Sequence, residues 1–329
     1  MVGPSSMKRL LKRLLLGNEA LPQEVTVAIC EPQREIAVWL HGEGAPRDVT
    51  YLHSIACASP FTVCLPFDSI EVLERQYGGD KGFLELREGA GAQRLLGKIG
   101  LRYSTAISAG KSCLGLFRAR SCVNYCLPKA HFWGHYLQQA YWRWRDKKVP
   151  NVRMSATDDH AMMVMFICPR PVVLVTAMEG HGGNLFPMNL MGHLGDSYFS
   201  LALNSERQAS QCVKRSGRVA LSSIPFEKAG VARQLGKHHL QSSIDWSQLP
   251  FRLKRSSRFG VPVPEFALRV RELEVQTVEE LGSHTFFVGR ILQEEIYTDG
   301  PSFFMIHGIY QRVRSTGTSV SDVRLQGCF

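Results

Sequence analysis

Polar side chains able to hold an anionic group gather at the end of one apolar run, at Asn204 to Ser210. Arg207 offers a guanidinium, and Ser205 and Ser210 offer hydroxyls on either side of it. A turn followed by a short helix over 211–215 adds backbone N–H donors. Charge-assisted hydrogen bonds from such groups suit a phosphate. The spacing therefore predicts a phosphate site at this turn, with a solvent-exposed Arg207 as the alternative.

A second segment, residues 182–189, has groups that suit a flat ring with a polar edge. Its glycines let the backbone approach closely, its amides supply hydrogen bonds, its proline fixes the loop and its methionine is a soft wall. The residues concerned are Gly182, Asn184, Pro187, Met188 and Asn189. An apolar strand that ends near Thr176 leads into this segment.

Together these motifs resemble the flavin reductase branch of the FMN-binding split-barrel proteins. Thr176 and the pattern Gly182-x-Asn184-x-x-Pro187 match the first part of the family signature, and Arg207–Ser210 is similar to its phosphate segment. The late stretch Gly282–Gly289 resembles the family's Gly-Asp-His-x-x-Phe-x-Gly. The resemblance covers about residues 155–312. Asn189 replaces the usual hydroxyl, and Ser283 replaces the acid.

The resemblance implies a flavoprotein that oxidises NADH or NADPH and reduces FMN, with FAD possible as the flavin. His284 would then border the nicotinamide, whereas its structural alternative is a hydrogen-bonded histidine at the rim of the barrel. Hydride transfer between the two rings requires orientation more than an acid or a base. Proteins of this family generally place flavin near a subunit interface, which implies a homodimer.

Two other functions stay open at this point. A flavin-binding module without reductase turnover, serving a partner, would suit the change at Ser283 and the loss of the family's Asp-Pro-Pro turn, of which only Asp196 remains. A basic interaction protein that uses the first half of the chain, beside a relic barrel, would suit the net charge of +10. The sequence has no RNP-like aromatic motif and no long basic run, so a nucleic-acid partner is not expected.

Three other motifs have weaker spacing. Ala109–Ser112 ends like a phosphate loop, but Thr105 stands where the loop needs its first glycine. His238 and His239 follow one another in a predicted mobile loop, as surface histidines or as contacts to a nicotinamide phosphate. Cys122, Cys126, His131 and His135 are too close together for a zinc loop of usual size, so no metal is expected.

Composition bounds the protein class. A hydrophobic content of 44% and a charged content of 21% are ordinary for a folded domain. No apolar run is long enough to cross a bilayer as a helix, so no transmembrane segment is expected. Met7–Leu16 predicts a short amphipathic helix rather than a signal peptide, with a membrane-surface anchor as the alternative. The nine scattered cysteines indicate reduced thiols, and thus a cytoplasmic protein.

The elements that must position these residues divide near residue 150. We expect an N-terminal domain over 1–150, of unknown role and uncertain α+β class, and a split-barrel domain over 151–329. The whole is expected to be mainly β with some α. The first half predicts strands at 24–30 and 35–40 around a turn, a strand at 61–65, and helices at 69–77 and 130–145. The second half predicts a helix at 231–235 and strands at 172–177, 198–203, 217–223, 266–278, 284–297 and 302–307.

A weak internal echo links the two halves. Val38-Trp39-Leu40 and Phe61–Leu65 parallel Val173-Leu174-Val175 and Tyr198–Ala202 at nearly the same separation. A degenerate duplicated half-barrel would explain the echo, and so would a chance agreement of two similar β segments. Under duplication, the first half would imitate the second subunit of a dimer.

Overall fold

The computed structural model describes residues 24–30, 35–89, 94–110, 112–129, 132–134, 137, 152–180 and 182–316. The predicted amphipathic helix at Met7–Leu16 and most of the predicted helix at 130–145 lie outside these residues. The described part of the chain has no helix with the length and apolar character that crossing a membrane requires.

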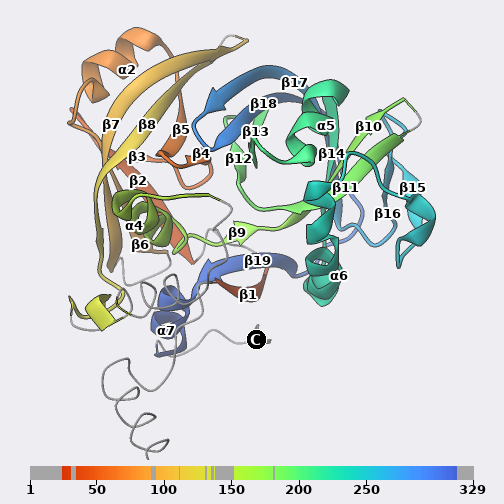
Figure 1. The fold of residues 1–329 in the computed structure, drawn as a ribbon. Helices are drawn as coiled ribbons and strands as arrows, with labels where there is room; N and C mark the ends of the chain where they lie inside the picture. The colour runs from red at the N-terminus through yellow and green to blue at the C-terminus, as the bar shows by residue number, and fades with distance from the viewer. Residues whose placement is uncertain are drawn as a thin grey trace, which may run out of the picture.

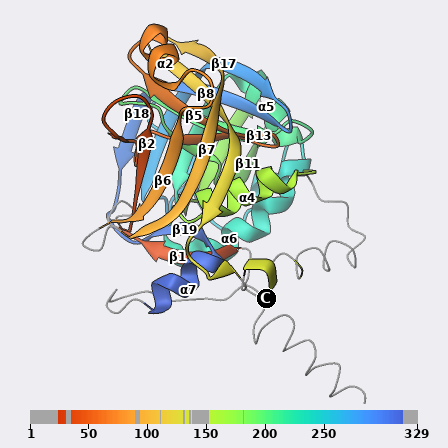
Figure 2. The ribbon, with the colours of Figure 1, turned by 90° about the vertical axis from the view of Figure 1, so that its left-hand side faces the viewer.

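The first half folds into a seven-stranded antiparallel sheet in the order β3-β2-β6-β7-β8-β5-β4 (Figures 1 and 2). Its strands are β2 (Ile36–His41), β3 (Arg47–Asp48), β4 (Ser54–Ala58), β5 (Phe61–Phe67), β6 (Phe83–Glu88), β7 (Leu95–Ala109) and β8 (Ser112–Asn124). Helix α2 (Ile70–Tyr77) connects β5 to β6, and the hydroxyl of Ser69 caps it by accepting from the Val72 amide.

The second half forms another seven-stranded antiparallel sheet, in the order β11-β10-β14-β17-β18-β13-β12. Its strands are β10 (Val173–Glu179), β11 (Gly182–Met188), β12 (Met191–His193), β13 (Tyr198–Asn204), β14 (Arg218–Ser223), β17 (Arg269–Leu281) and β18 (His284–Ile296). Helix α5 (Gln208–Ser216) connects β13 to β14 and packs into the concave side of this sheet.

The two sheets have the same connectivity. In each, the strands taken in chain order occupy the second, first, seventh, sixth, third, fourth and fifth places of the sheet. A helix follows the fourth strand in both, α2 in the first half and α5 in the second. The echo in the sequence falls on equivalent strands, β2 with β10 and β5 with β13. The shared strand order is the one that a duplicated half-barrel would have.

The sequence echo, which aligns Phe61 with Tyr198, nevertheless differs by one residue from the structural alignment of β5 with β13. Phe61, Val63 and Leu65 point into the core of the first half, whereas Phe199, Leu201 and Leu203 point into the core of the second. The strand registers make Val63 the structural equivalent of Phe199, since Val63 pairs with Phe117 and Phe199 pairs with Gly289 at matching places of the two hairpins. Because side chains alternate between the two faces of a strand, a shift of one residue exchanges the faces.

The halves exchange hairpin tips across a seam. Gly282, in the β17–β18 turn, lies against Ser59 and Pro60 of the first half. Gly110, in the β7–β8 turn, lies against Tyr198 of the second half. Both glycines have a positive φ, of 58° and 59°. Ala109–Ser112 is therefore the turn of a long hairpin. Small and aliphatic side chains of both halves fill the seam between these tips, among them Ala56, Leu116, Ala202 and Val288.

Other segments brace the two halves. Strand β1 (Glu24–Ile29) pairs with β19 (Ser302–His307), which also pairs with β9 (Arg170–Pro171). The predicted hairpin of residues 24–30 with 35–40 is therefore wrong, since β1 and β2 belong to different sheets. The smaller elements are α6 (Ala229–Gln234), the 3-10 helices η2 (Phe226–Lys228), η3 (Leu235–Leu240) and η4 (Trp246–Gln248), the pair β15 (Leu253–Arg255) and β16 (Pro262–Pro264), and α7 (Gly308–Thr316).

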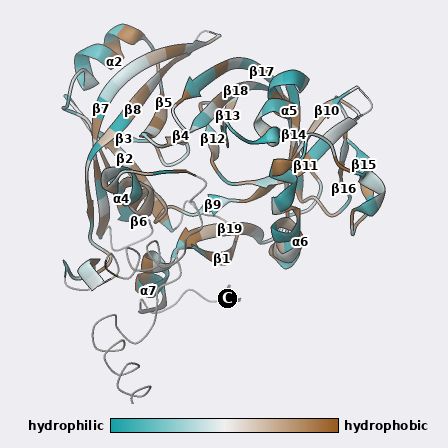
Figure 3. Ribbon diagram, in the orientation of Figure 1, coloured by the Kyte–Doolittle hydropathy of each residue, from teal (hydrophilic) through white to brown (hydrophobic). Residues whose placement is uncertain are grey.

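Helix α4 (Ala156–Met165) follows the division expected near residue 150 and was not predicted from the sequence. Ser155 and Asp158 form a capping box at its start. The Asp158 carboxylate also accepts from the Phe61 amide at 2.7 Å and from the Ser59 hydroxyl at 3.2 Å. The helix packs on β5, β7 and β8, in the core of the first half. Figure 3 shows hydrophobic segments along the strands of both sheets, whereas α5 is largely hydrophilic.

Candidate functional site

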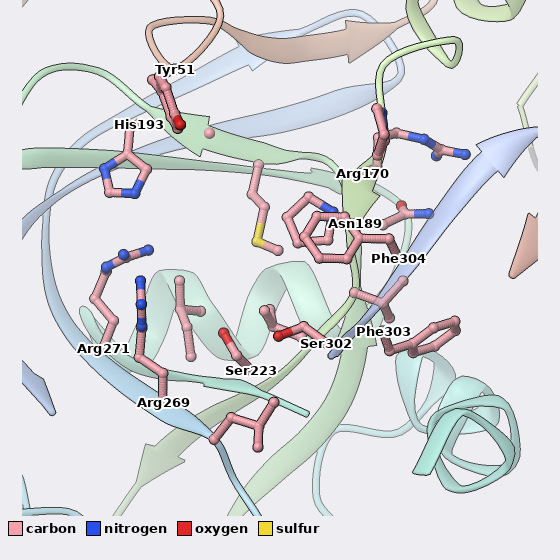
Figure 4. Close-up of a pocket in the computed structure, with 18 of the residues that line it drawn as sticks. Tyr51, Arg170, Asn189, His193, Ser223, Arg269, Arg271, Ser302, Phe303 and Phe304 are labelled. Carbon is pink, nitrogen blue, oxygen red and sulfur yellow. The ribbon is translucent and has the colours of Figure 1, made fainter. Parts of the chain in front are cut away.

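A cavity of about 740 Å³ opens between the two halves (Figure 4). The first half contributes Tyr51 and His53, from the segment between β3 and β4. Val173, Phe199 and Leu221 form an apolar wall from the concave side of the second sheet. Further polar lining comes from Thr50, Arg170, Asn189, His193, Ser223, Arg269, Arg271, Thr298, Asp299 and Ser302. The cavity therefore combines an apolar wall with a few converging polar groups, which is typical of ligand sites.

Two arginines of β17 stand at one end of the cavity, as Figure 4 shows. Arg271 contacts Glu294 at 2.9 Å, and Arg269 contacts the same carboxylate at 3.2 Å. The guanidinium of Arg271 also lies 4.5 Å from the centre of the Phe199 ring. Burial lowers the pKa of Arg271, and Glu294 opposes that shift. Two cations share one carboxylate here, so this end of the cavity favours an anionic group.

His193 faces the same end of the cavity (Figure 4). Burial, aided by the positive charge of Arg271, lowers the pKa of His193 to about 4. Its imidazole is therefore neutral near pH 7, with one nitrogen that donates and one that accepts. The ring packs edge-on against Phe199, with 4.8 Å between the ring centres.

Arg170 lies on the opposite side of the cavity. Its guanidinium pairs with Glu24 at 3.0 Å and lies 3.1 Å from the centre of the Phe166 ring. Asn189 is nearby, and its side-chain nitrogen is 3.6 Å from the sulfur of Met305. Of the residues that the sequence assigned to a cofactor, Asn189 is the one that lines this cavity among those described.

The predicted phosphate residues lie elsewhere, at the start of α5. Asn204 accepts from the Glu206 amide at 2.9 Å, closing a tight turn, and Arg207 is the N-cap residue. The Ser205 hydroxyl is 3.4 Å from the Ser283 carbonyl oxygen. Ser210 is fully buried, and its hydroxyl has no hydrogen-bond partner within the described residues. The structure brings Ser205 and Arg207 together at the surface and turns Ser210 inward.

The predicted ring loop at 182–189 is largely strand β11, because its backbone pairs with β10 from Gly182 to Met188. Asn184 is buried, and its amide nitrogen donates to the carbonyl oxygens of His238 at 2.9 Å and Gln241 at 2.6 Å. Met188 points into the core of the second half. Thr176, on β10, donates to the Pro262 carbonyl oxygen at 2.9 Å.

The adjacent histidines fasten η3 to β11. The His238 ring lies 2.8 Å from the Leu185 carbonyl oxygen, and the His239 ring lies 2.7 Å from that of Pro187. His238 is buried, and burial lowers the pKa of His239. Neither residue is the mobile surface histidine that the sequence indicated. Both hold a segment that covers β11.

His284 lies at the seam, beside the exchanged hairpin tip. Its Nδ1 is 2.8 Å from the Ser283 hydroxyl and 3.4 Å from the Ala58 backbone nitrogen. Burial lowers the pKa of His284 to about 4. The residue is 5% exposed, and it does not belong to the described lining of the cavity.

The sequence missed the residues that give the cavity its charge. Arg269 and Arg271 alternate with Leu268 and Val270, which indicated a strand with a solvent-facing arginine row. Arg271 is 8% exposed, because it packs against Glu294 and the ring of Phe199 beside the cavity. Tyr51 carries no motif at all. Of the discarded zinc pattern, Cys122 and Cys126 are described, whereas His131 and His135 lie outside the described residues.

A family model, the flavin reductase like domain, matches residues 165–313. No curated protein sequence matches the chain. An FMN-binding protein from Thermus thermophilus is 23% identical, over 41% of this chain and 81% of its own, with a TM-score of 0.37. An NADH:FAD oxidoreductase from Streptomyces globisporus is 17% identical, over 48% of this chain and 95% of its own, with a TM-score of 0.41.

The family model runs from the end of α4 into α7 and includes every strand of the second sheet. The chain is mainly β with some helices, and the curled second sheet is the split barrel of that family. Residues 165–313 therefore form a flavin reductase-like domain.

Proposed function

We propose that the protein binds a flavin in the cavity between its halves and reduces it with NADH or NADPH. The observation that carries this proposal is the cavity itself, which belongs mostly to the flavin reductase-like domain. FMN is the favoured flavin, and FAD is the alternative. The chemistry that a bound flavin supplies is the acceptance of a hydride from a reduced nicotinamide.

The cavity fits such a group in size and in character. Its volume of about 740 Å³ is within the usual range for ligand pockets, roughly 300–1,000 Å³. Val173, Phe199 and Leu221 would face the ring, and Asn189 would offer its amide to the polar edge of the ring. Exclusion of water by this wall would strengthen each polar contact inside the cavity.

The phosphate of FMN has two candidate positions. The family resemblance favours Ser205, Arg207 and Ser210 at the start of α5. The charge of the cavity favours Arg269 and Arg271, and the complete burial of Ser210 weakens the first position. We therefore propose that Arg269 and Arg271 face the phosphate. Arg207 remains a prediction from the sequence.

Quenching of flavin fluorescence during titration tests the proposal directly. The wild-type protein should bind FMN with a micromolar or lower dissociation constant. Ser223→Trp places a large ring in the cavity and should weaken binding at least tenfold. Ser257→Trp, at an exposed serine outside the cavity lining, is the matched control and should bind like wild type.

Turnover is measured separately, as oxidation of NADH and NADPH in the presence of FMN. Oxidation that Ser223→Trp abolishes supports the reductase. Flavin binding without any nicotinamide oxidation would support a flavin-binding module that serves a partner. Equal FMN affinity of the wild type and Ser223→Trp would show that the flavin does not bind in this cavity.

A further inference from the structure

We propose that the first half takes the place of a second subunit. One chain then forms one complete flavin site, and the equivalent position on the first sheet is filled by protein. This inference rests on the proposed function for the identity of the ligand. It rests on the fold alone for the pairing of the halves. The two parts therefore have separate tests.

The pairing follows from three features of the fold. The two sheets share one strand order, and each sends the tip of its central hairpin against the other half. Gly282 meets Ser59 and Pro60, and Gly110 meets Tyr198. A common apolar core then joins the sheets between these tips. Such reciprocal contacts are those of an isologous dimer, in which each partner offers the same surface.

The cavity itself is shared between the halves. The second half supplies its arginines and its apolar wall, and the first half supplies Tyr51 and His53. In a true dimer, the partner chain would bring this second wall. The Tyr51 side chain reaches the cavity from above in Figure 4, opposite the arginines of β17.

Duplication should produce a second cavity on the concave side of the first sheet. The open cavity is bordered by Phe199 on β13 and by Arg269 and Arg271 on β17. The equivalent strands of the first sheet are β5 and β7, and α4 packs on both of them.

Helix α4 and the short segment that follows it pack closely on β7. A Cβ atom added at Gly97, on β7, would lie 2.6 Å from Val164 and 3.2 Å from Ile167. Asp158 of α4 accepts a hydrogen bond from the Phe61 amide, two residues before Val63, the structural equivalent of Phe199. Helix α4 therefore fills in the first half the space that the second half leaves open.

Light scattering tests the pairing without any flavin. We expect the mass of one chain, 36.9 kDa, across a dilution series. A stable mass of two chains would overturn the internal pairing and favour the homodimer that the family resemblance implies.

Titration with FMN tests the shared site. We expect one flavin per chain, with Tyr51→Ala weakening FMN binding at least fivefold at unchanged mass. Tyr125→Ala is the matched control, since Tyr125 is an exposed tyrosine of the same half that does not line the cavity. Two flavins per chain, or an unchanged affinity in Tyr51→Ala, would overturn the shared single site. An absence of FMN binding with a single-chain mass would refute the proposed function and leave the pairing supported.

Discussion

The two halves of the molecule contain sheets with the same strand order, and the two sheets differ in what covers their concave faces. In the first half, α4 covers Gly97 and completes a closed core. In the second half, no helix among the described residues takes that place, and the strand equivalent to β7 carries Arg269 and Arg271. Two sheets of one strand order therefore differ in what their concave faces hold, a packed helix in the first half and an open cavity in the second.

The largest expected loss of stability comes from disrupting the packing of α4 in the first half. Val164→Asp places a carboxylate at a position that is 1% exposed against β7. We expect the free energy of unfolding to fall by about 3–5 kcal/mol, as for an unpaired buried charge. Urea denaturation measures this loss. A loss below about 1 kcal/mol would mean that α4 is not part of the core of the first half.

The hairpin tips should differ in their tolerance of a side chain. At Gly282 an added Cβ meets backbone atoms of Ser59, whereas at Gly110 it meets the terminal atoms of the Tyr198 side chain, which can rotate away. We expect Gly282→Ala to cost about 2–4 kcal/mol and Gly110→Ala about 1–2 kcal/mol.

The control for these tips is Gly260→Ala, where φ is 64° and an added Cβ has no neighbour within 4 Å. It isolates the backbone strain, about 1 kcal/mol. Thermal melting of the three variants gives the comparison. Equal losses at Gly282 and Gly260 would show that the tip of β17–β18 is not confined by the first half.

A smaller effect, on FMN affinity, should follow from removing one of the arginines that line the cavity. Arg269→Gln removes one of the two guanidiniums and leaves Arg271 paired with Glu294. We expect FMN affinity to fall about tenfold, or about 1.4 kcal/mol, while riboflavin affinity stays the same. Arg218→Gln, at an exposed arginine of β14, is the control. A larger loss from Arg207→Ala than from Arg269→Gln would place the phosphate at α5.

The smallest effect concerns the seam and appears only on acidification. The pKa of His284 falls from 6.5 to about 4 on folding, so the unfolded chain binds more protons between these values. This histidine therefore costs stability progressively as the pH falls from about 6.5 to about 4. His284→Asn should flatten that part of the curve of melting temperature against pH. Stopped-flow reduction of the same variant tests the role beside the nicotinamide that the resemblance implies. A pH curve parallel to that of wild type would show that His284 is not buried at the seam.

The sequence predicted those strands whose pattern is visible within one short segment. Residues 265–274 alternate, and the segment after His284 is rich in Phe and Val. The strands predicted at 266–278 and 284–297 correspond to β17 and β18 with small shifts at their ends. Strands β7 and β8 went unpredicted, because Gly97, Gly100 and a run of small polar residues obscure their alternation. Their long hairpin is stabilised by pairing and by the other half, which no local pattern records.

The site was harder to predict than the fold. Asn184 has the right type and spacing for a cofactor contact, yet its amide binds the backbone of η3. Arg271 resembled a solvent-facing residue because the cavity that receives it forms between two distant segments. Tyr51 is separated from Arg271 by most of the chain and has no motif. Residues that only the tertiary structure brings together have no fixed spacing in the sequence, so no motif predicts them.

The seam between the halves has a consequence for dilution. Its core combines small side chains such as Ala56 and Ala202 with larger ones such as Leu116, Phe286 and Val288. Two separate subunits with such an interface would dissociate when their concentration fell below the dissociation constant. Within one chain, the partner is always present at an effective concentration of the order of millimolar. The joined chain can therefore keep its shared cavity assembled at any expression level, and substitutions that weaken the seam are tolerated further than in a dimer.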